Sequence, residues 1–441
     1  MSLKFSCTIG LAIFSVSFFD LNAYALPAFA LREKISCTFC HTNGSAPHLT
    51  KMGFLYRRAG FRFPDDLENS EKDNMAMELT KHLAAGVNVD YLVATQESAT
   101  AGSKKSVTDN EVSVREVEIW PLVGAFLGNM GAWSEVDYSP SVMQPRGSQT
   151  PAGATTPAAG GIALSMADLR YYKGNADLFF SFRAGLMAPE GYGASDQWAD
   201  DAALPSFETK TANYNEDTLV TPLGAMNVPQ LGMEFGLNYN LSSFLTLGVY
   251  NGFDGSNGAT SGVQSTLIPG MNRHGRDLKA QIDQFVGSSL ALTGVYYDGR
   301  IELLDPSNQF VFANNFNQER LYLTYFALPG TVDLMGGGAL SSNEYANSGD
   351  SASAGRFKSN GWFAGLNYYV MPHLTLGGHF DMFKYAYGVG STPAIHPQAK
   401  GFTLIASVPF ENTMIDLHYM KNASDVEGRS ANYRLEWRFL F

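Results

Sequence analysis

The last ten residues of the chain, NYRLEWRFLF (432–441), alternate strictly between apolar and polar side chains. The apolar set is Tyr433, Leu435, Trp437, Phe439 and Phe441, and the polar set is Asn432, Arg434, Glu436 and Arg438. A period of two predicts a β-strand with one apolar and one wet face. An apolar outer face, a polar inner face and a terminal aromatic residue are typical of an outer-membrane β-barrel.

The same alternation recurs upstream in the stretches 234–241, 320–325 and 415–419. A weak internal repeat supports this interpretation, because GLNYNLSSFLTLG from Gly236 resembles GLNYYVMPHLTLG from Gly365. Each copy predicts a strand, a tight turn and a second strand. We therefore expect residues 81–441 to form an all-β transmembrane barrel.

Short turns allow the strands to be counted. Seven are predicted, near Gly128–Asn129, Gly174–Asn175, Leu241–Ser243, Gly287–Ser288, Pro329–Gly330, Met371–His373 and Glu411–Asn412. Longer polar stretches separate them, and the longest runs from Pro189 to about Val228. Seven hairpins with one further strand at each end predict about 16 antiparallel strands, with both barrel ends on the periplasmic side.

The N-terminus predicts export. Residues 1–25 combine an early lysine, an apolar run and the small-residue site Ala23-Tyr24-Ala25, which together indicate a cleaved signal peptide. The apolar run is shorter than the roughly 20 residues that a spanning helix needs. Elsewhere the sequence contains no uninterrupted run of 18 apolar residues, so we expect any membrane crossing to use strands. A net charge of −12 argues against nucleic acid as a partner.

After cleavage, the mature chain keeps two of its three cysteines, Cys37 and Cys40, in the stretch ISCTFCHTNG (35–44). Cys-x-x-Cys-His is the attachment signal for one covalently bound haem c. A redox-active or structural disulfide and a chance match are the alternatives. No strand–helix pattern surrounds the motif as in thioredoxin-like proteins, and a zinc site would need more cysteines. Residues 26–80 are therefore predicted to form a small, mostly helical monohaem cytochrome c plug.

The sequence LPAFALREKISCTFCH, followed by Pro47, Leu49, Gly53, Gly60 and Phe61, resembles the N-terminal haem segment of the fused cytochrome–porins. These monohaem proteins of the bacterial outer membrane include the iron oxidases of iron-oxidising bacteria. The chain departs from the family pattern at Thr50, Met52 and Phe61, where asparagine, phenylalanine and tyrosine are usual. The resemblance implies an outer-membrane cytochrome that oxidises extracellular Fe(II) and reduces a periplasmic c-type cytochrome.

His41, which completes the motif, is the predicted axial ligand of the haem iron. The sixth ligand stays open among the residues between the motif and the barrel. Met75 or Met77 is favoured, because both follow a polar break in the chain, and His82 is a weaker candidate at the start of the first strand. His48 and Met52 would need the chain to turn back, because Pro47 to Arg58 is predicted to be one helix on the proximal side.

Other charged residues have a functional and a plain interpretation. Arg57, Arg58 and Arg62 could pair with haem propionates, or they could form a solvated basic face. Four residues on predicted lumen faces could guide a cation, or they could be ordinary polar wall in a wet interior: His379, Asp381, Asp416 and His418.

The predicted function joins these parts. Because the outer membrane insulates, a haem plug at the periplasmic mouth or in the lumen could carry electrons from an external donor, possibly Fe(II), to a periplasmic cytochrome. The alternatives are a porin-like solute channel with a regulatory or structural haem plug, electron export to an external acceptor, and a peroxidase with an open iron position. The sequence leaves the oligomeric state open, and a trimer is worth testing.

Overall fold

A computed structural model gives the structure of the chain. It describes residues 29, 33, 35, 37–41, 49–63, 83–97, 106–126, 128–141, 159–189, 212–215, 218–220, 230–251, 272–304, 310–328, 330–347, 355–371, 374–385, 398–410, 413–424 and 428–440. Among these residues, no helix has both the length and the apolarity needed to cross a membrane.

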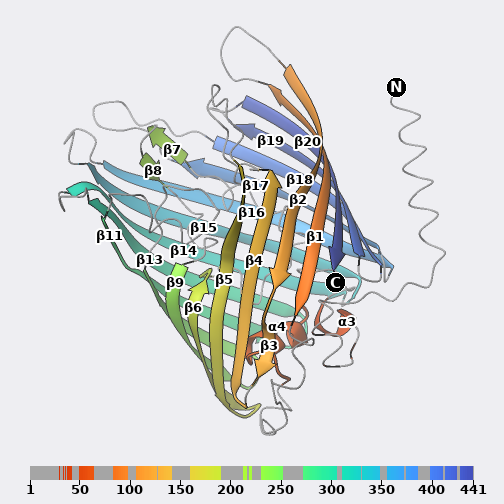
Figure 1. Ribbon diagram of the computed structural model, residues 1–441, viewed down its shortest axis with the longest axis vertical. Coiled ribbons are helices and arrows are strands. Elements are labelled where there is room, and N and C mark those ends of the chain that lie inside the picture. Colours follow the sequence, from red (N-terminus) through yellow and green to blue (C-terminus); the bar gives the residue numbers. More distant parts are fainter. Residues whose placement is uncertain are drawn as a thin grey trace.

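The strands form one large antiparallel sheet that closes on itself (Figure 1). Its segments are β1 (Ala84–Glu97), β2 (Ser106–Trp120), β3 (Val123–Phe126), β4 (Met130–Ser141), β5 (Ala159–Gly174), β6 (Leu178–Met187), β9 (Gln230–Tyr239), β10 (Ser243–Tyr250), β11 (Asn272–Gly275), β12 (Asp277–Val286), β13 (Leu290–Leu304), β14 (Phe310–Leu328), β15 (Val332–Asn347), β16 (Gly355–Met371), β17 (Leu374–Tyr385), β18 (Gln398–Phe410), β19 (Thr413–Ser424) and β20 (Gly428–Leu440). The first strand, β1, pairs with both β2 and β20, so no edge remains at this seam.

The barrel has sixteen strands, because two of them are interrupted. Segments β2 and β3 both pair with β4 and are separated by Pro121 and Leu122, where proline removes a backbone donor. Segments β11 and β12 both pair with β13 and are separated by Arg276. The prediction of about 16 antiparallel strands is confirmed.

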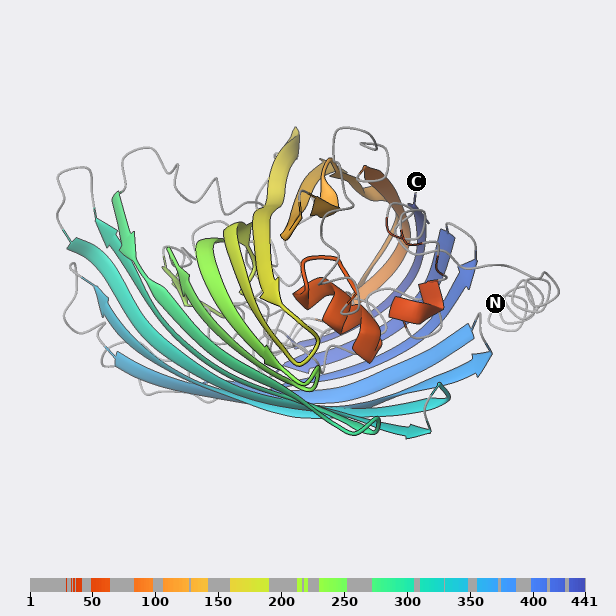
Figure 2. The same ribbon diagram turned by 90° about the horizontal axis from the view of Figure 1, so that it is seen from below.

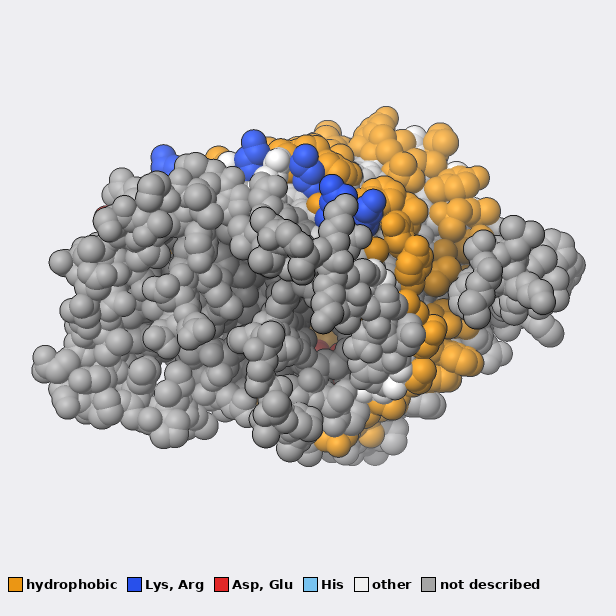
Figure 3. Space-filling model, turned by 90° about the horizontal axis from the view of Figure 1, so that it is seen from above, with side chains coloured by type: hydrophobic (Ala, Val, Ile, Leu, Met, Phe, Trp, Pro, Cys, Tyr) orange, Lys and Arg blue, Asp and Glu red, His pale blue; other side chains and the backbone are white. Residues whose placement is uncertain are grey.

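Burial in the barrel is the reverse of that in a soluble protein. In β20, Tyr433 and Trp437 are 54% and 43% exposed, whereas Glu436 between them is fully buried. Hydrophobic side chains cover much of the outer wall where it is described (Figure 3). Asp416 and His418 in β19 are buried on the inner face, as their alternation predicted. An apolar exterior around a polar interior is the arrangement that lipid requires.

Each of the seven predicted short turns lies between two paired consecutive strands, at the end of the barrel where β1 begins and β20 ends, although residues 329, 372–373 and 411–412 lie outside the described residues. Four of them place a glycine at positive φ: Gly128, Gly174, Gly287 and Gly330. The turn between β9 and β10 instead uses Asn240 and Leu241, both with φ of 50°. Outer-membrane barrels have their short turns on the periplasmic side, which is where the sequence analysis expects this end of the barrel.

The longest connection follows β6 and contains a two-stranded hairpin, β7 (Ala212–Asn215) with β8 (Thr218–Val220), that the sequence did not predict. Helices α3 (Cys37–Cys40) and α4 (Lys51–Arg58) precede the barrel. Both lie inside the curve of the wall when the molecule is seen from below (Figure 2). Helix α4 starts at Lys51, not at the predicted Pro47, because Thr50 caps it.

Candidate functional site

The Cys-x-x-Cys segment packs closely on the start of α4. The Thr50 backbone N–H donates to the Cys40 carbonyl (2.8 Å), and the Thr50 hydroxyl donates to the Phe39 carbonyl (2.8 Å). The same hydroxyl accepts from the Gly53 N–H (3.1 Å), which makes Thr50 the N-cap of α4. A Cβ atom at Gly53 would collide with the Cys40 carbonyl oxygen, so only glycine allows this approach.

The donor set of the motif suits a covalent haem. Cys37 and Cys40 begin and end α3, and His41 follows directly, held by an antiparallel backbone bridge to Leu49. The Cys40 thiol is free and half-buried, and burial, assisted by the carboxylate of Glu33, raises its pKa to about 11. A thiol with a raised pKa is a poor redox nucleophile, because the thiolate is the reactive form. Two thiols and an adjacent imidazole would hold one haem c, a one-electron redox group when bound.

Aromatic rings surround the turn that follows α4. Phe61 stacks on Phe29 (5.1 Å between centroids) and on Trp133 of β4 (5.8 Å). Tyr56 contacts Phe29 (5.6 Å) and Phe63 (4.8 Å). Thus the N-terminal segment and the barrel wall share one apolar cluster, which could shield a porphyrin from water.

The apolar face of α4 packs on the wall near the short turns. Phe54 makes edge contacts with Phe244 of β10 (5.0 Å) and Phe285 of β12 (5.5 Å). The whole buried cluster is Phe54, Leu55, Ala59, Tyr172, Phe179, Phe244, Phe285 and Ala291, and Met52 packs against it. Because these wall residues lie beside the turns, α4 occupies the short-turn mouth of the barrel.

Arg58 fastens α4 to the wall through polar contacts. Its guanidinium donates to Asp283 of β12 (3.0 Å) and to the Thr246 hydroxyl of β10 (2.9 Å). The Asp283 side chain is fully buried, so the ion pair is largely shielded from water. This arginine therefore has a partner in the protein, which neither of its two sequence interpretations anticipated.

Arg57 and Arg62 also meet the wall. Arg170 of β5 donates to the Arg57 carbonyl (3.3 Å), and its guanidinium lies 4.5 Å above the Phe61 ring centroid. Arg62 lies over the Tyr172 ring (5.9 Å) and is only 6% exposed. The interpretation of Arg62 as part of a solvated face is wrong, because the barrel wall covers it.

Of the residues considered as a sixth haem ligand, the structure describes Met52. Met75, Met77, His48 and His82 lie outside the described residues. Met52 packs against the apolar cluster on the wall.

The predicted lumen residues form pairs of their own. His379 Nε2 lies 3.6 Å from Asp381, and His418 Nε2 lies 4.0 Å from Glu436. Asp381 and Glu436 are themselves inward-facing residues of the wall. They support the plain interpretation of a polar wall.

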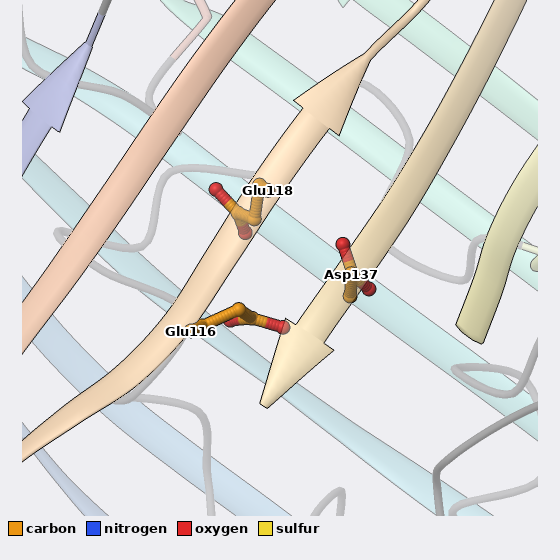
Figure 4. Close-up of side chains that lie close together, drawn as sticks. All are labelled: Glu116, Glu118 and Asp137. Atoms are coloured by element: carbon orange, nitrogen blue, oxygen red, sulfur yellow. The ribbon is translucent and has the colours of Figure 1, made fainter. Parts of the chain in front are cut away.

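The inner wall also carries a cluster of carboxylates that the pattern of a single strand could not reveal, since its members come from β2 and β4. Glu116, Glu118 and Asp137 each offer an oxygen within 4.8 Å of the others (Figure 4). Glu118 and Asp137 lie directly opposite each other in the ladder. Glu135 next to them accepts the indole N–H groups of Trp120 (3.2 Å) and Trp133 (3.1 Å).

Fold and burial together define the class: a membrane-spanning β-barrel of the outer-membrane type. No family model and no curated protein matches the chain. Among solved structures, the outer membrane channel DcaP of Acinetobacter baumannii is 10% identical with a TM-score of 0.51, and the match covers 81% of this chain and 96% of that chain.

Two further structures resemble the chain more weakly. An anion-selective porin from Comamonas acidovorans is 11% identical (81% of this chain, 98% of that chain, TM-score 0.48). A loop-deletion mutant of OmpT from Vibrio cholerae is 9% identical (81% and 99%, TM-score 0.48). At these identities the likeness concerns the fold alone.

Proposed function

We propose that this protein is an outer-membrane cytochrome in which one haem c, attached to Cys37 and Cys40 and ligated by His41, serves electron transfer across the membrane. The observation that carries the proposal is the position of the motif. The segment that holds it packs on α4, and α4 packs on the inner wall at the short-turn mouth. A haem attached at this mouth would explain why the haem segment and the barrel are joined in one chain.

The residues of the chain have defined tasks in this proposal. Thr50 and Gly53 hold the motif against α4, and Phe54 and Arg58 hold α4 on the wall. The aromatic cluster around Phe61 would limit the access of water to the haem. Met75, Met77 or His82 would supply the sixth ligand, and the haem, when bound, supplies a one-electron redox centre.

The resemblance of the motif segment to cytochrome–porins suggests the partners. The donor would be extracellular Fe(II), the acceptor a periplasmic c-type cytochrome, and the activity that of an Fe(II)-oxidising cytochrome. Export of electrons to an external acceptor uses the same parts in the opposite direction.

Two measurements test the proposal in order. Intact-mass analysis of the mature chain should show one added porphyrin, which the C37A/C40A variant should lack. Stopped-flow mixing of the oxidised protein with Fe(II) should then reduce the haem. A wild-type chain without porphyrin would overturn the proposal, and a haem that Fe(II) does not reduce at the working pH would remove iron as the donor.

A solute channel with a structural haem plug is the second candidate. The polar inner wall and the fold shared with the outer membrane channel DcaP favour it. Taken alone, these two observations support a channel better than electron transfer. Solute flux into liposomes that contain the purified protein, with no electron exchange between the haem and external Fe(II), would establish the channel instead.

A further inference from the structure

The carboxylates of Glu116, Glu118 and Asp137 face one another on the inner wall of the barrel (Figure 4). Three ionised carboxylates at this separation repel one another unless a cation or protons compensate them. In Ca²⁺ sites the metal–oxygen distance is about 2.3–2.6 Å, so two oxygens on one ion lie at most about 5 Å apart. The observed limit of 4.8 Å is therefore compatible with a single shared ion.

A fourth oxygen, independent of the carboxylates, points to a ligand. Asn88 of β1 lies directly opposite Glu116 in the β1–β2 ladder and on the same inner face. Its side chain is only 5% exposed, and within the described part of the chain its Oδ1 atom accepts no hydrogen bond. A buried amide oxygen without a donor costs free energy, and a hard cation would satisfy it.

The neighbours of the cluster are already occupied. Glu135 accepts two indole N–H groups, from Trp120 and Trp133. Arg438 of β20, opposite Asn88, donates to Glu436 (2.9 Å) and also acts electrostatically on Glu118, so this one positive charge serves carboxylates both inside and outside the cluster. One arginine does not balance the three carboxylates of the cluster, so the candidate donor oxygens are those of Asn88, Glu116, Glu118 and Asp137.

We propose that Asn88, Glu116, Glu118 and Asp137 form a binding site for one hard divalent cation of the Ca²⁺, Mg²⁺ or Mn²⁺ class. Carbonyl and carboxylate oxygens, without sulfur or imidazole, are the ligands that such ions prefer. Water would complete the coordination from the lumen side. The site connects β1, β2 and β4 beside the closing seam, and it does not depend on a bound haem.

Mn²⁺ is the probe, because loss of the EPR signal of the free ion measures its binding to purified full-length protein in detergent. Wild-type protein should bind one Mn²⁺ per chain, and Ca²⁺ should displace it. E118Q/D137N should weaken binding by about tenfold or more, since ligand charge determines the affinity of such sites. N88L should weaken it less, whereas N88D should strengthen it.

The matched control is D333N, which removes a buried lumen carboxylate that accepts from Tyr369 on the distant strands β15 and β16. It should bind Mn²⁺ like the wild type. Wild-type protein that binds no Mn²⁺, or binding that E118Q/D137N leaves unchanged, would overturn the proposal. If E118Q/D137N does not fold, wild-type stoichiometry and the comparison of N88D with N88L still decide.

Discussion

At two positions of the N-terminal segment, the backbone geometry limits which residue can be accommodated. Gly53 allows α4 to touch the Cys40 carbonyl, and Phe61 has a φ of 66°, which is strained for an aromatic residue. Gly60 before it has a φ of 65°, so the chain turns sharply after α4. The strain at Phe61 is offset by its ring contacts with Phe29 and Trp133.

G53A tests the close approach of α4 to the motif. An added methyl group must push the Cys40 carbonyl away, and overpacking of this kind costs about 1–3 kcal/mol. We expect fewer chains with attached haem, measured as the ratio of haem to protein, and faster hydrogen exchange in α4. G336A is the control, because its Cβ would lie 3.6 Å from the Phe363 carbonyl, an ordinary contact. Equal haem ratios in both variants would contradict the packing argument.

The thiol of Cys40 provides a test by pH. Its pKa is raised from 9.0 to about 11, so the folded state favours the protonated thiol. This contribution to stability is complete below pH 9.0 and is lost as the pH rises toward 11. In folded haem-free C37S protein at pH 8, the thiolate fraction should be about a hundredfold smaller than in the same protein unfolded in urea. Alkylation by iodoacetamide should be correspondingly slower, and equal rates would contradict burial of the thiol.

For the strands, the local sequence contained most of the information needed to predict their number and the turns between them. Alternation with a period of two depends on each strand alone, and the turns carry glycine, proline, asparagine or serine. The seven turns and the sixteen strands could therefore be predicted. The interruptions at Pro121 and Arg276 and the hairpin β7–β8 were missed, because short segments carry too little periodic pattern.

The sequence predicted the helix α4, but it did not predict which residues of the wall this helix contacts. Its start at Lys51 follows from the Thr50 cap, and threonine caps almost as well as the asparagine usual in the cytochrome–porin family. The partners of Arg58 lie 188 and 225 positions away along the chain, so no local pattern could reveal them. The carboxylate cluster was missed for the same reason, since it forms across strands.

A double-mutant cycle measures how strongly α4 is held on the wall. R58M, D283N and R58M/D283N should give a coupling free energy of about 1–3 kcal/mol for the ion pair, because Asp283 is fully buried. The readout is the opening free energy of α4 from hydrogen exchange in detergent. Additive effects of the two substitutions would show that the contact contributes no net stabilisation.

On the scale of the whole molecule, burial is inverted relative to a soluble protein. Polar side chains such as Asp416 and His418 are fully enclosed, whereas large apolar side chains such as Trp437 lie outside. The sequence predicted this inversion from the two faces of β20. It also predicted a plug at the periplasmic mouth or in the lumen, but it could not predict which strands of the wall hold α4, because those contacts join distant elements.

Substitutions on the two faces of β20 test the inversion. Leu435 is 43% exposed near the middle of the strand, and L435R should destabilise the barrel in liposomes by about 2–4 kcal/mol. N432K places a similar charge on the wet inner face and should cost less than about 1 kcal/mol. Urea unfolding followed by tryptophan fluorescence gives both values. A larger cost for N432K than for L435R would reverse the assignment of the faces.

The seam between β1 and β20 has a consequence for biogenesis. Gly86 pairs with Leu440, so the first and last strands meet only after the entire polypeptide has been synthesised and delivered. Until then two rows of backbone amides and carbonyls have no partner, a condition that hydrocarbon does not tolerate. Insertion is therefore a terminal, all-or-none event, and a nonsense mutation anywhere before residue 428 should yield material for periplasmic proteases rather than a smaller pore.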